Sequence, residues 1–551
     1  MFVDGRAIDQ NEVRQYDLCI VGSGPAGISI AREFIGRDES VCVLESGGLR
    51  FDSETQSLAA GEETGQPFFT LVSIVLRYFG GTSNHWAGNC FPLSSIAMGH
   101  REWVDAPAWP VSLERLMPFY HRAQELIGLP EDPWDLSHWL MKMGGQVLPL
   151  KAGPLEPVPV QIKPQRFGQV YREELEQASN VHVHLWSNLT ELETDVNAAT
   201  VRRARVKCLN GRTFAVQARR FVLASGGVEN ARLLLLSNGA RPTGLGNEHD
   251  QVGRFFMDHP RLVAGELHPQ VDARPSRAFL TMRNGQDKVA IQYRLSEKAQ
   301  TERRTTQSAV ALRPISPEWF PDRSQSLPIM SYRQILRNIK HARVPDDFGK
   351  HLANVFSDPG EVSRYVYGDL RYGDDQPVDH YRCYVRFEPN PNPESRVTLS
   401  ERVDALGMRR AKLNWALADR DRHTVRETMR ALTAQVGRSG YGHVRSFVEE
   451  EEWGWPSDTL GGRHEMGTTR ISEDPTQGVV NQDCRVHGVD NLYIAGSSVF
   501  PTVGSGWPTM TLIAMALRLA DHLKQSGRVD EVESVSPAIG NASSVDAPVR
   551  G

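Results

Sequence analysis

A glycine-rich turn followed by an acidic residue is the first group in the sequence with a clear chemical task. The turn spans residues 22–27 (GSGPAG), and Glu45 follows its second glycine by about 20 residues. Gly22 allows the tight turn, Gly24 lets backbone approach a pyrophosphate, and Gly27 lets a helix pack closely on a strand. A carboxylate at Glu45 accepts hydrogen bonds from a ribose diol and repels a 2′-phosphate, which favours FAD or NAD over NADP.

The elements that position this turn are predicted from the spacing of apolar residues. Residues 16–21 read as a short buried strand, residues 26–35 have helical apolar spacing, and residues 41–44 read as a second buried strand. The start of such a helix offers free N–H groups and a partial positive charge to phosphates. The sequence therefore predicts a strand–turn–helix–strand unit that binds a dinucleotide. The motif alone does not separate FAD from NAD.

Composition limits the class of protein. A length of 551 residues predicts two domains, and a hydrophobic content of 40% with 23% charged residues is typical of a soluble globular protein. A net charge of −5 indicates no nucleic-acid partner. With no signal-like start and no apolar run of about 18 residues, we expect a cytoplasmic protein without a membrane span. The six cysteines form no CxxC pair, so we expect core thiols and no metal site. The sequence leaves the oligomeric state open.

Further segments rich in glycine and small polar residues look like backbone that wraps a ligand. Residues 80–89 (GGTSNHWAGN) follow an apolar run. Residues 220–227 read as a strand ending in Ser-Gly-Gly before a helix, and residues 492–498 repeat the pattern as a strand followed by Gly-Ser-Ser. Residues 504–511 (GSGWPTMT) open a helix that is expected to run to Leu523. These segments suit one cofactor domain.

The remaining segments have a different character. Residues 101–180 are rich in proline and tryptophan, with a predicted helix from Leu113 to Ile127. Between residues 260 and 450, strand-like alternation is mixed with helical spans such as Asp419 to Val436. We therefore predict a mixed α/β (α+β) chain in which a substrate domain with a mostly antiparallel sheet is inserted into the cofactor domain. The expected boundaries are 1–100, 181–260 and 451–525 for the cofactor domain, 101–180 and 261–450 for the substrate domain, and 526–551 for a disordered tail.

Four blocks carry a resemblance to a known family. They are residues 22–45, 80–86 (GGTSNHW), 253–260 (GRFFMDHP) and 464–511. With these blocks in the same order, the chain resembles the glucose–methanol–choline (GMC) family of flavin oxidoreductases over about residues 15 to 525. The closest similarity is to the branch of pyranose oxidases and sugar dehydrogenases. The resemblance implies a Rossmann-like FAD-binding domain, a substrate domain with a large sheet, and oxidation of an alcohol by hydride transfer to flavin N5.

The resemblance also implies which residues bind FAD. The ADP half is expected at residues 22–27 and Glu45, and the flavin at residues 81–84. The ribityl chain and pyrophosphate are expected near residues 496–497, and the pyrimidine edge near residues 507–509. The expected FAD-binding residues are Gly22, Gly24, Ala26, Gly27, Glu45, Ser46, Gly80, Gly81, Thr82, Asn84, His85, Trp86, Ala224, Ser225, Gly496, Ser497, Pro508 and Thr509.

His85 raises the question of a covalent flavin. In pyranose oxidases with covalently bound flavin, the histidine of a similar Thr-His-Trp segment carries the 8α-methyl link. Here the segment is Asn84-His85-Trp86, and similar segments also occur where FAD is held non-covalently. We expect non-covalent FAD, with His85 packing on the flavin ring, and keep a covalent link through His85 as the alternative.

The resemblance assigns catalysis to His464 and Trp507. His464 matches the family's histidine-bearing turn, and a neutral imidazole is a suitable base for the alcohol proton near pH 7. Trp507 is a departure, because the pyranose oxidase branch has asparagine there and many other members have a second histidine. An indole donates one hydrogen bond and accepts none, so Trp507 is no second proton acceptor. His259, in the third block, is interpreted as structural, with a position near the active site as the alternative.

The expected function is FAD-dependent oxidation of a secondary alcohol to a ketone, with His464 as base. The sugar-branch resemblance suggests a sugar, glycoside or polyol-like substrate, with O₂ or a quinone-like compound as electron acceptor. The alternative is a flavin-dependent lyase or other non-oxidative enzyme on the same fold, which Trp507 leaves open. A third reading, an NAD-binding dehydrogenase or an inactive scaffold, is disfavoured because an NAD enzyme has no need of the glycine-rich segments at 80–89 and 504–511.

Overall fold

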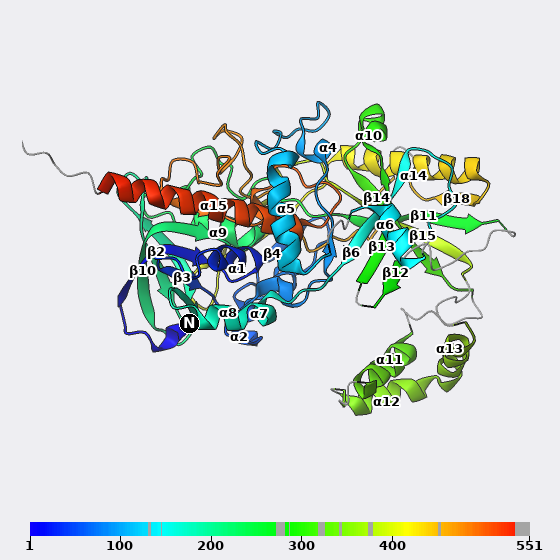
Figure 1. Cartoon of the computed structure of the whole chain (residues 1–551), viewed down its shortest axis with the longest axis horizontal. Helices are drawn as coiled ribbons and strands as arrows, with labels where there is room; N and C mark the ends of the chain where they lie inside the picture. The colour runs from blue at the N-terminus through cyan, green and yellow to red at the C-terminus, as the bar shows by residue number, and fades with distance from the viewer. Residues whose placement is uncertain are drawn as a thin grey trace, which may run out of the picture.

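The computed structural model arranges the chain around two large β-sheets that lie side by side, each covered by helices (Figure 1). It describes residues 1–130, 134–144, 146–270, 281–285, 287–317, 326–340, 344–345, 347–372, 378–449 and 453–534.

The first sheet is largely parallel and has the strand order β1-β7-β3-β2-β10-β9-β8, with β19 also pairing with β10. The pairings from β1 through β7, β3 and β2 to β10, and that of β10 with β19, are parallel. Strand β9 pairs antiparallel with both β10 and β8. The strand at 41–44 begins and ends as the sequence predicts, and the Rossmann-like sheet is confirmed. The strands are β1 (Phe2–Asp4), β2 (Val13–Val21), β3 (Val41–Leu44), β7 (Val181–Leu185), β8 (Asn188–Thr194), β9 (Val201–Lys207), β10 (Thr213–Leu223) and β19 (Leu492–Ile494).

Four parallel strands end at one edge of this sheet. Val21 at the end of β2 pairs with Leu44 of β3 and with Leu223 of β10, and Leu223 pairs in turn with Ile494 of β19. The glycine-rich turns and Glu45 follow directly after these residues, so segments separated by hundreds of residues meet at this edge. In open α/β sheets, ligands bind at the carboxyl ends of the strands.

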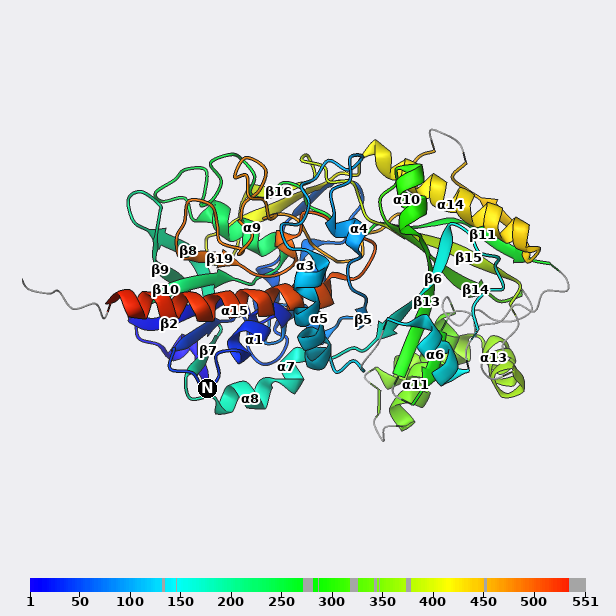
Figure 2. The ribbon, with the colours of Figure 1, turned by 45° about the horizontal axis from the view of Figure 1, so that its top comes forward.

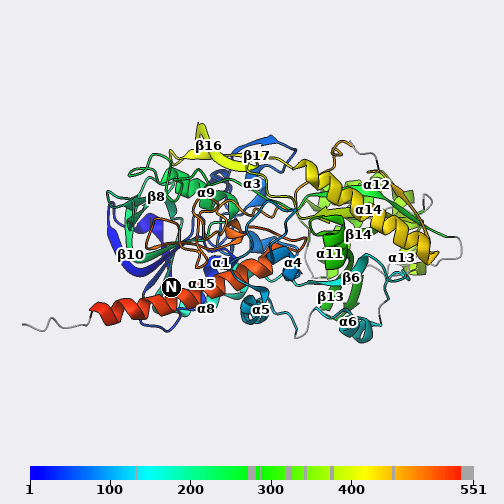
Figure 3. The same cartoon turned by 90° about the horizontal axis from the view of Figure 1, so that it is seen from above.

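Helices α1 (Pro25–Arg32) and α5 (Leu113–Ile127) pack against the long helix α15 (Pro508–Ser534), which runs along the first sheet (Figure 3). α15 continues past Leu523, where the helix was expected to end, and so enters the predicted tail. Residues 535–551 of that tail lie outside the described residues. Within the part of the chain that the structure describes, no helix combines the length and apolarity needed to cross a membrane.

The second sheet is antiparallel, with the order β18-β11-β15-β14-β13-β6-β5 and β12 on β13, which confirms the separate antiparallel sheet. Along β15, buried and half-buried residues alternate. The buried face packs under α14 (Asp419–Ser439), whose Val425, Met429 and Leu432 are fully buried (Figure 2). The strands are β5 (Asn89–Cys90), β6 (Leu155–Ile162), β11 (Arg261–Pro269), β12 (Thr281–Asn284), β13 (Asp287–Leu295), β14 (Ser308–Ile315), β15 (His380–Phe387) and β18 (Gly442–Ser446).

Smaller elements complete the fold. A three-stranded sheet joins β16 (Arg396–Val403), β17 (Arg409–Trp415) and β4 (Glu62–Gly65). All six cysteines are buried and unbridged. Helices α11, α12 and α13 pack on one another beside the second sheet (Figure 1). The remaining helices are α2 (Ser53–Ser57), α3 (Leu71–Ile74), α4 (Ser95–Met98), α6 (Leu136–Met143), α7 (Phe167–Val170), α8 (Arg172–Gln177), α9 (Gly227–Leu236), α10 (Glu297–Arg303), α11 (Leu327–Lys340), α12 (Phe348–Ser357) and α13 (Pro359–Tyr372).

Candidate active site

A cavity of about 690 Å³ lies at the carboxyl edge of the first sheet and is lined by residues of both sheets. This volume is in the usual range for pockets that enclose small molecules. Most of the residues expected to bind the cofactor line it, as do both residues assigned to catalysis. They are Gly22, Gly24, Ala26, Glu45, Ser46, Gly81, Thr82, His85, Trp86, Ala224, Ser225, Gly496, Ser497, Pro508 and Thr509, with His464 and Trp507.

Three of the expected cofactor residues lie outside the lining. A Cβ on Gly27 would collide with the carbonyl oxygen of Gly22, so Gly27 serves the close packing of α1 on β2. Gly80 has a positive φ of 95°, and the Asn84 amide donates a hydrogen bond to the Phe79 carbonyl at 2.8 Å. Gly80 and Asn84 therefore shape the turn that brings Gly81 and Thr82 to the cavity.

The cavity has the features that a bound dinucleotide requires. A Cβ built on Gly24, Gly226 or Gly496 would meet no heavy atom within 4 Å, so these backbones face open space. Glu45 is held at the edge of the cavity because it accepts hydrogen bonds from Ser23 N (3.1 Å) and Gly47 N (2.9 Å). Sequence reasoning did not anticipate these two partners.

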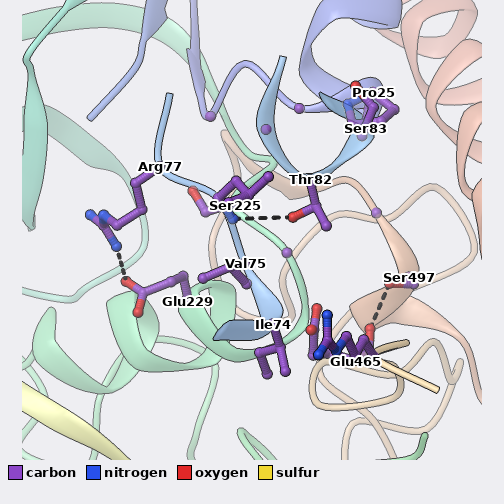
Figure 4. Close-up of a pocket in the computed structure, with 18 of the residues that line it drawn as sticks. Pro25, Ile74, Val75, Arg77, Thr82, Ser83, Ser225, Glu229, Glu465 and Ser497 are labelled. Carbon is purple, nitrogen blue, oxygen red and sulfur yellow. Dashed lines mark hydrogen bonds and ion pairs between the residues drawn. The ribbon is translucent and has the colours of Figure 1, made fainter. Parts of the chain in front are cut away.

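Glu465 gives a second indication that a ligand binds in this cavity. Its Oε1 is buried with no hydrogen-bond partner among the described residues. Burial, together with the nearby Asp258, raises the pKa of Glu465 to about 8, so this carboxyl is mostly protonated at pH 7 and can donate a hydrogen bond. Figure 4 places Glu465 and Ser497 on one side of the pocket and Arg77 and Glu229 on the other. The unsatisfied oxygen fits a cavity that a polar ligand such as FAD completes.

A buried carboxylate positions the turn that carries His464. Asp258 accepts hydrogen bonds from the backbone N–H groups of Gly462 (2.8 Å), Arg463 (3.0 Å) and His464 (3.1 Å). Burial raises the pKa of Asp258 to about 6, and these N–H groups oppose that rise. Because Arg463 has a left-handed φ of 62°, the turn depends on the three hydrogen bonds to Asp258.

The hydrogen bonds of His259 select the tautomer of His464. His259 Nε2 lies 2.9 Å from the Gly504 carbonyl, which only accepts, so Nε2 carries the proton. Burial lowers the pKa of His259 to about 3, so the ring is neutral and its Nδ1 is an acceptor. His464 Nδ1 lies 3.1 Å from that atom and must donate to it. His464 Nε2 is therefore left as an unprotonated acceptor with no partner among the described residues.

We expect flavin reduction to persist at acidic pH. Burial lowers the pKa of His464 well below 6.5, and His259 and Arg386 lower it further. A base stays unprotonated above its pKa, so the acidic limb of kcat/KM should lie well below pH 6.5. Stopped-flow reduction across a pH series, with flavin absorbance as a check on cofactor retention, measures this limb. A limb centred at the ordinary histidine pKa would contradict the assignment.

Several residues at this end of the cavity were not found by sequence reasoning. Arg261, Arg386 and Glu465 line it, and the Arg386 guanidinium lies 3.5 Å from the centre of the Trp507 ring. His259, interpreted as structural, contacts His464 directly. A signal for His259 was present, since it lies in the 253–260 block. Nothing in the sequence marked the two arginines. Among the described residues no cluster of side chains suits a metal ion.

The fold and the cavity together fit a protein that binds a dinucleotide between a largely parallel and an antiparallel sheet. Residues 391–516 match the model of the GMC oxidoreductase family. The chain is 24% identical to paromamine 6'-oxidase of Streptomyces fradiae and 21% identical to 2-methyl-1,2-propanediol dehydrogenase of Mycolicibacterium austroafricanum. Both matches cover 93% of this chain, and 92% and 95% of the two relatives.

The structure resembles that of pyridoxine 4-oxidase from Mesorbium loti, with a TM-score of 0.56 and 18% identity. That likeness covers 93% of this chain and 99% of the other. The chain is therefore similar to GMC oxidoreductases, and that family implies FAD as the cofactor. The match to the pyranose oxidase branch stays a prediction.

Proposed function

We propose that the chain oxidises the hydroxyl group of a sugar-like or polyol-like alcohol, with His464 as the base. The observation that carries this proposal is the lone pair of His464 Nε2, which the contact with His259 leaves free in a cavity that also fits FAD. Two relatives are named for hydroxyl-bearing compounds, paromamine and 2-methyl-1,2-propanediol, which supports an alcohol substrate. FAD, when bound, supplies the acceptor for the hydride.

His464, His259 and Trp507 have different roles in the proposed reaction. His464 Nε2 takes the proton of the alcohol. His464 Nδ1 donates its own proton in the hydrogen bond to His259 Nδ1, so this second nitrogen is not available as a base. Trp507 accepts no proton, and its ring lies against the Arg386 guanidinium. Of these two residues His464 is therefore the base. Trp507 shapes the end of the cavity that it shares with Arg261 and Arg386, which we call the substrate end.

Three finer points of the proposal stay predictions. FAD is expected to be held non-covalently. In His85, the candidate for a covalent link, Nε2 lies 3.1 Å from the Tyr78 hydroxyl oxygen. The acceptor is expected to be O₂ or a quinone-like compound, and the location cytoplasmic. The oxidised carbon is expected to be secondary, which gives a ketone.

The test is anaerobic mixing of the holoenzyme with a panel of monosaccharides, glycosides and simple secondary alcohols. We expect at least one class to bleach the flavin absorbance and to yield the corresponding carbonyl compound. A panel that leaves the flavin oxidised would exclude alcohol oxidation of these classes. Cleavage of a substrate without any flavin reduction would favour the lyase reading instead.

A further inference from the structure

The charged residues at the two ends of the cavity differ in their partners. At one end, Arg77 pairs with Glu229 at 3.4 Å and Arg232 pairs with Asp404 at 2.7 Å. Each cation there faces a carboxylate, so that end of the cavity carries balanced charge. A ligand bound there meets guanidinium groups whose charge the protein has already neutralised.

At the substrate end, two cations face each other without an acid. Arg261 of β11 and Arg386 of β15 are direct partners across the strands, and both line the cavity. Arg386 donates from Nε to the Ser505 carbonyl at 2.8 Å and from Nη2 to Gln292 at 3.0 Å, both neutral acceptors. The Arg261 guanidinium lies over the Tyr384 ring at 5.6 Å. Neither arginine has a carboxylate partner among the described residues.

This arrangement costs stability unless a ligand compensates for it. Like charges directly opposite each other across two strands are destabilising, and a desolvated cation without a counter-ion is costly. Burial and, to a smaller extent, the charge of Arg261 together lower the pKa of Arg386 to about 9, so Arg386 is still charged at pH 7. Glu465 does not offset it, because its raised pKa keeps that carboxyl mostly protonated.

We propose that the substrate is an alcohol that carries a carboxylate, which Arg261 and Arg386 bind beside His464. This inference rests on the proposed alcohol oxidation and names its substrate class. Guanidinium groups present planar N–H pairs that match the two oxygens of a carboxylate. Arg386 keeps N–H groups without a described acceptor, and the exposed Arg261 places a second positive charge opposite it, so a carboxylate satisfies donors and charge together. The same charges repel the ammonium groups of an aminoglycoside such as paromamine.

The first test compares hydroxy acids with their primary amides, which have nearly the same shape and no charge. Lactate, glycerate and glucuronate are each mixed anaerobically with the holoenzyme beside lactamide, glyceramide and glucuronamide. We expect at least one acid to reduce the flavin with a kcat/KM about 10- to 100-fold above that of its amide, the scale of a lost charged hydrogen bond. Equal values for acid and amide in every pair would overturn the inference.

Two variants assign the preference to these side chains. Arg261→Gln changes an exposed residue and is expected to fold, while Arg386→Gln removes the inner guanidinium. Each should lower the acid-to-amide ratio by about tenfold. Arg445→Gln, on the exposed part of neighbouring strand β18 and outside the cavity lining, is the matched control and should leave the ratio unchanged. A parallel loss for acid and amide would show a general structural or flavin effect and would overturn the inference.

A binding measurement separates this inference from the proposed reaction. Propionate and propionamide lack the hydroxyl group and cannot be oxidised as alcohols. We expect propionate, but not propionamide, to perturb the absorbance of the oxidised flavin saturably, and the perturbation to weaken in Arg261→Gln and Arg386→Gln. If propionate binds but no alcohol reduces the flavin, alcohol oxidation fails and the anion site stands. If neutral alcohols reduce the flavin and propionate does not bind, the anion site fails alone.

Discussion

Replacing His464 by alanine is expected to lower the rate of flavin reduction by substrate about 10²–10⁴-fold, the scale of a lost general base. The geometry gives the reason. His464 Nε2 is the lone pair that the contact with His259 leaves free, and the turn that carries His464 is fixed by Asp258. FAD content should be unchanged, because the backbone of the turn holds its hydrogen bonds to Asp258 without the imidazole. Anaerobic stopped-flow reduction and the flavin-to-protein absorbance ratio measure the two quantities.

Two further variants sharpen this result. His464→Gln keeps a side chain that accepts hydrogen bonds but is no base near neutral pH, so it should lose nearly as much rate as His464→Ala. His121→Ala, at an exposed position on α5, removes a histidine outside the cavity lining and should have the rate of the wild type. A loss below tenfold in His464→Ala would mean that another group takes the proton.

Replacing Glu388 by glutamine is expected to cost about 3–5 kcal/mol of stability, the usual result of leaving one partner of a buried ion pair alone. Arg101 Nη1 and Nη2 meet the two oxygens of Glu388 at 2.7 and 2.8 Å, with both side chains 2% exposed or less. Glu388 also accepts the backbone N–H groups of Gln307 and Val503, both at 3.2 Å. The Arg101–Glu388 pair therefore links the end of β15 and the start of β14 to the segment that leads to Trp507. The midpoint of thermal unfolding of the holoenzyme reports the loss.

Comparison with an exposed pair isolates the effect of burial. Glu401→Gln breaks a pair with Arg409 at 2.6 Å, but Glu401 is 94% exposed, so the cost should be below about 1 kcal/mol. The double variant Arg101→Met with Glu388→Gln should be less destabilised than the sum of its single changes, because no buried charge is left alone. Equal shifts for Glu388→Gln and Glu401→Gln would contradict this account.

Much of the cofactor half could be predicted because its signals are local. A buried strand, a glycine turn and an apolar helix follow one another within about thirty residues at the dinucleotide motif, so β3 and the turn after β2 are found from spacing alone. The carboxyl-edge rule for parallel sheets then brings Gly22, Ser225 and Gly496 together without further information. Neither step needs knowledge of how distant side chains meet.

The substrate end could not be predicted in the same way. The contact between His259 and His464 joins residues 205 positions apart through two ring nitrogens. Arg261 and Arg386 lie opposite each other because of the register of β11 against β15. A shift of one residue in that register would turn the side chains of the shifted strand to the other face of the sheet. The alternation of apolar and polar residues within one strand does not say which residue of the neighbouring strand lies opposite. The three helices α11–α13 were not among the elements predicted from the sequence.

The order in which the first sheet is assembled has a consequence for biosynthesis. Phe221, Val222 and Leu223 of β10 are fully buried, and they pair with β19, which is made more than 260 residues later. A ribosome-bound chain therefore carries an unpaired apolar strand edge through about half of its translation, the condition that favours misassembly and chaperone binding. Strand β19 completes the sheet, and Pro508 and Thr509 at the start of α15 then complete the rim of the cavity. We therefore expect FAD to bind only after residues 492–509 have been made, so cofactor supplied after their synthesis should rescue yield as well as cofactor supplied throughout.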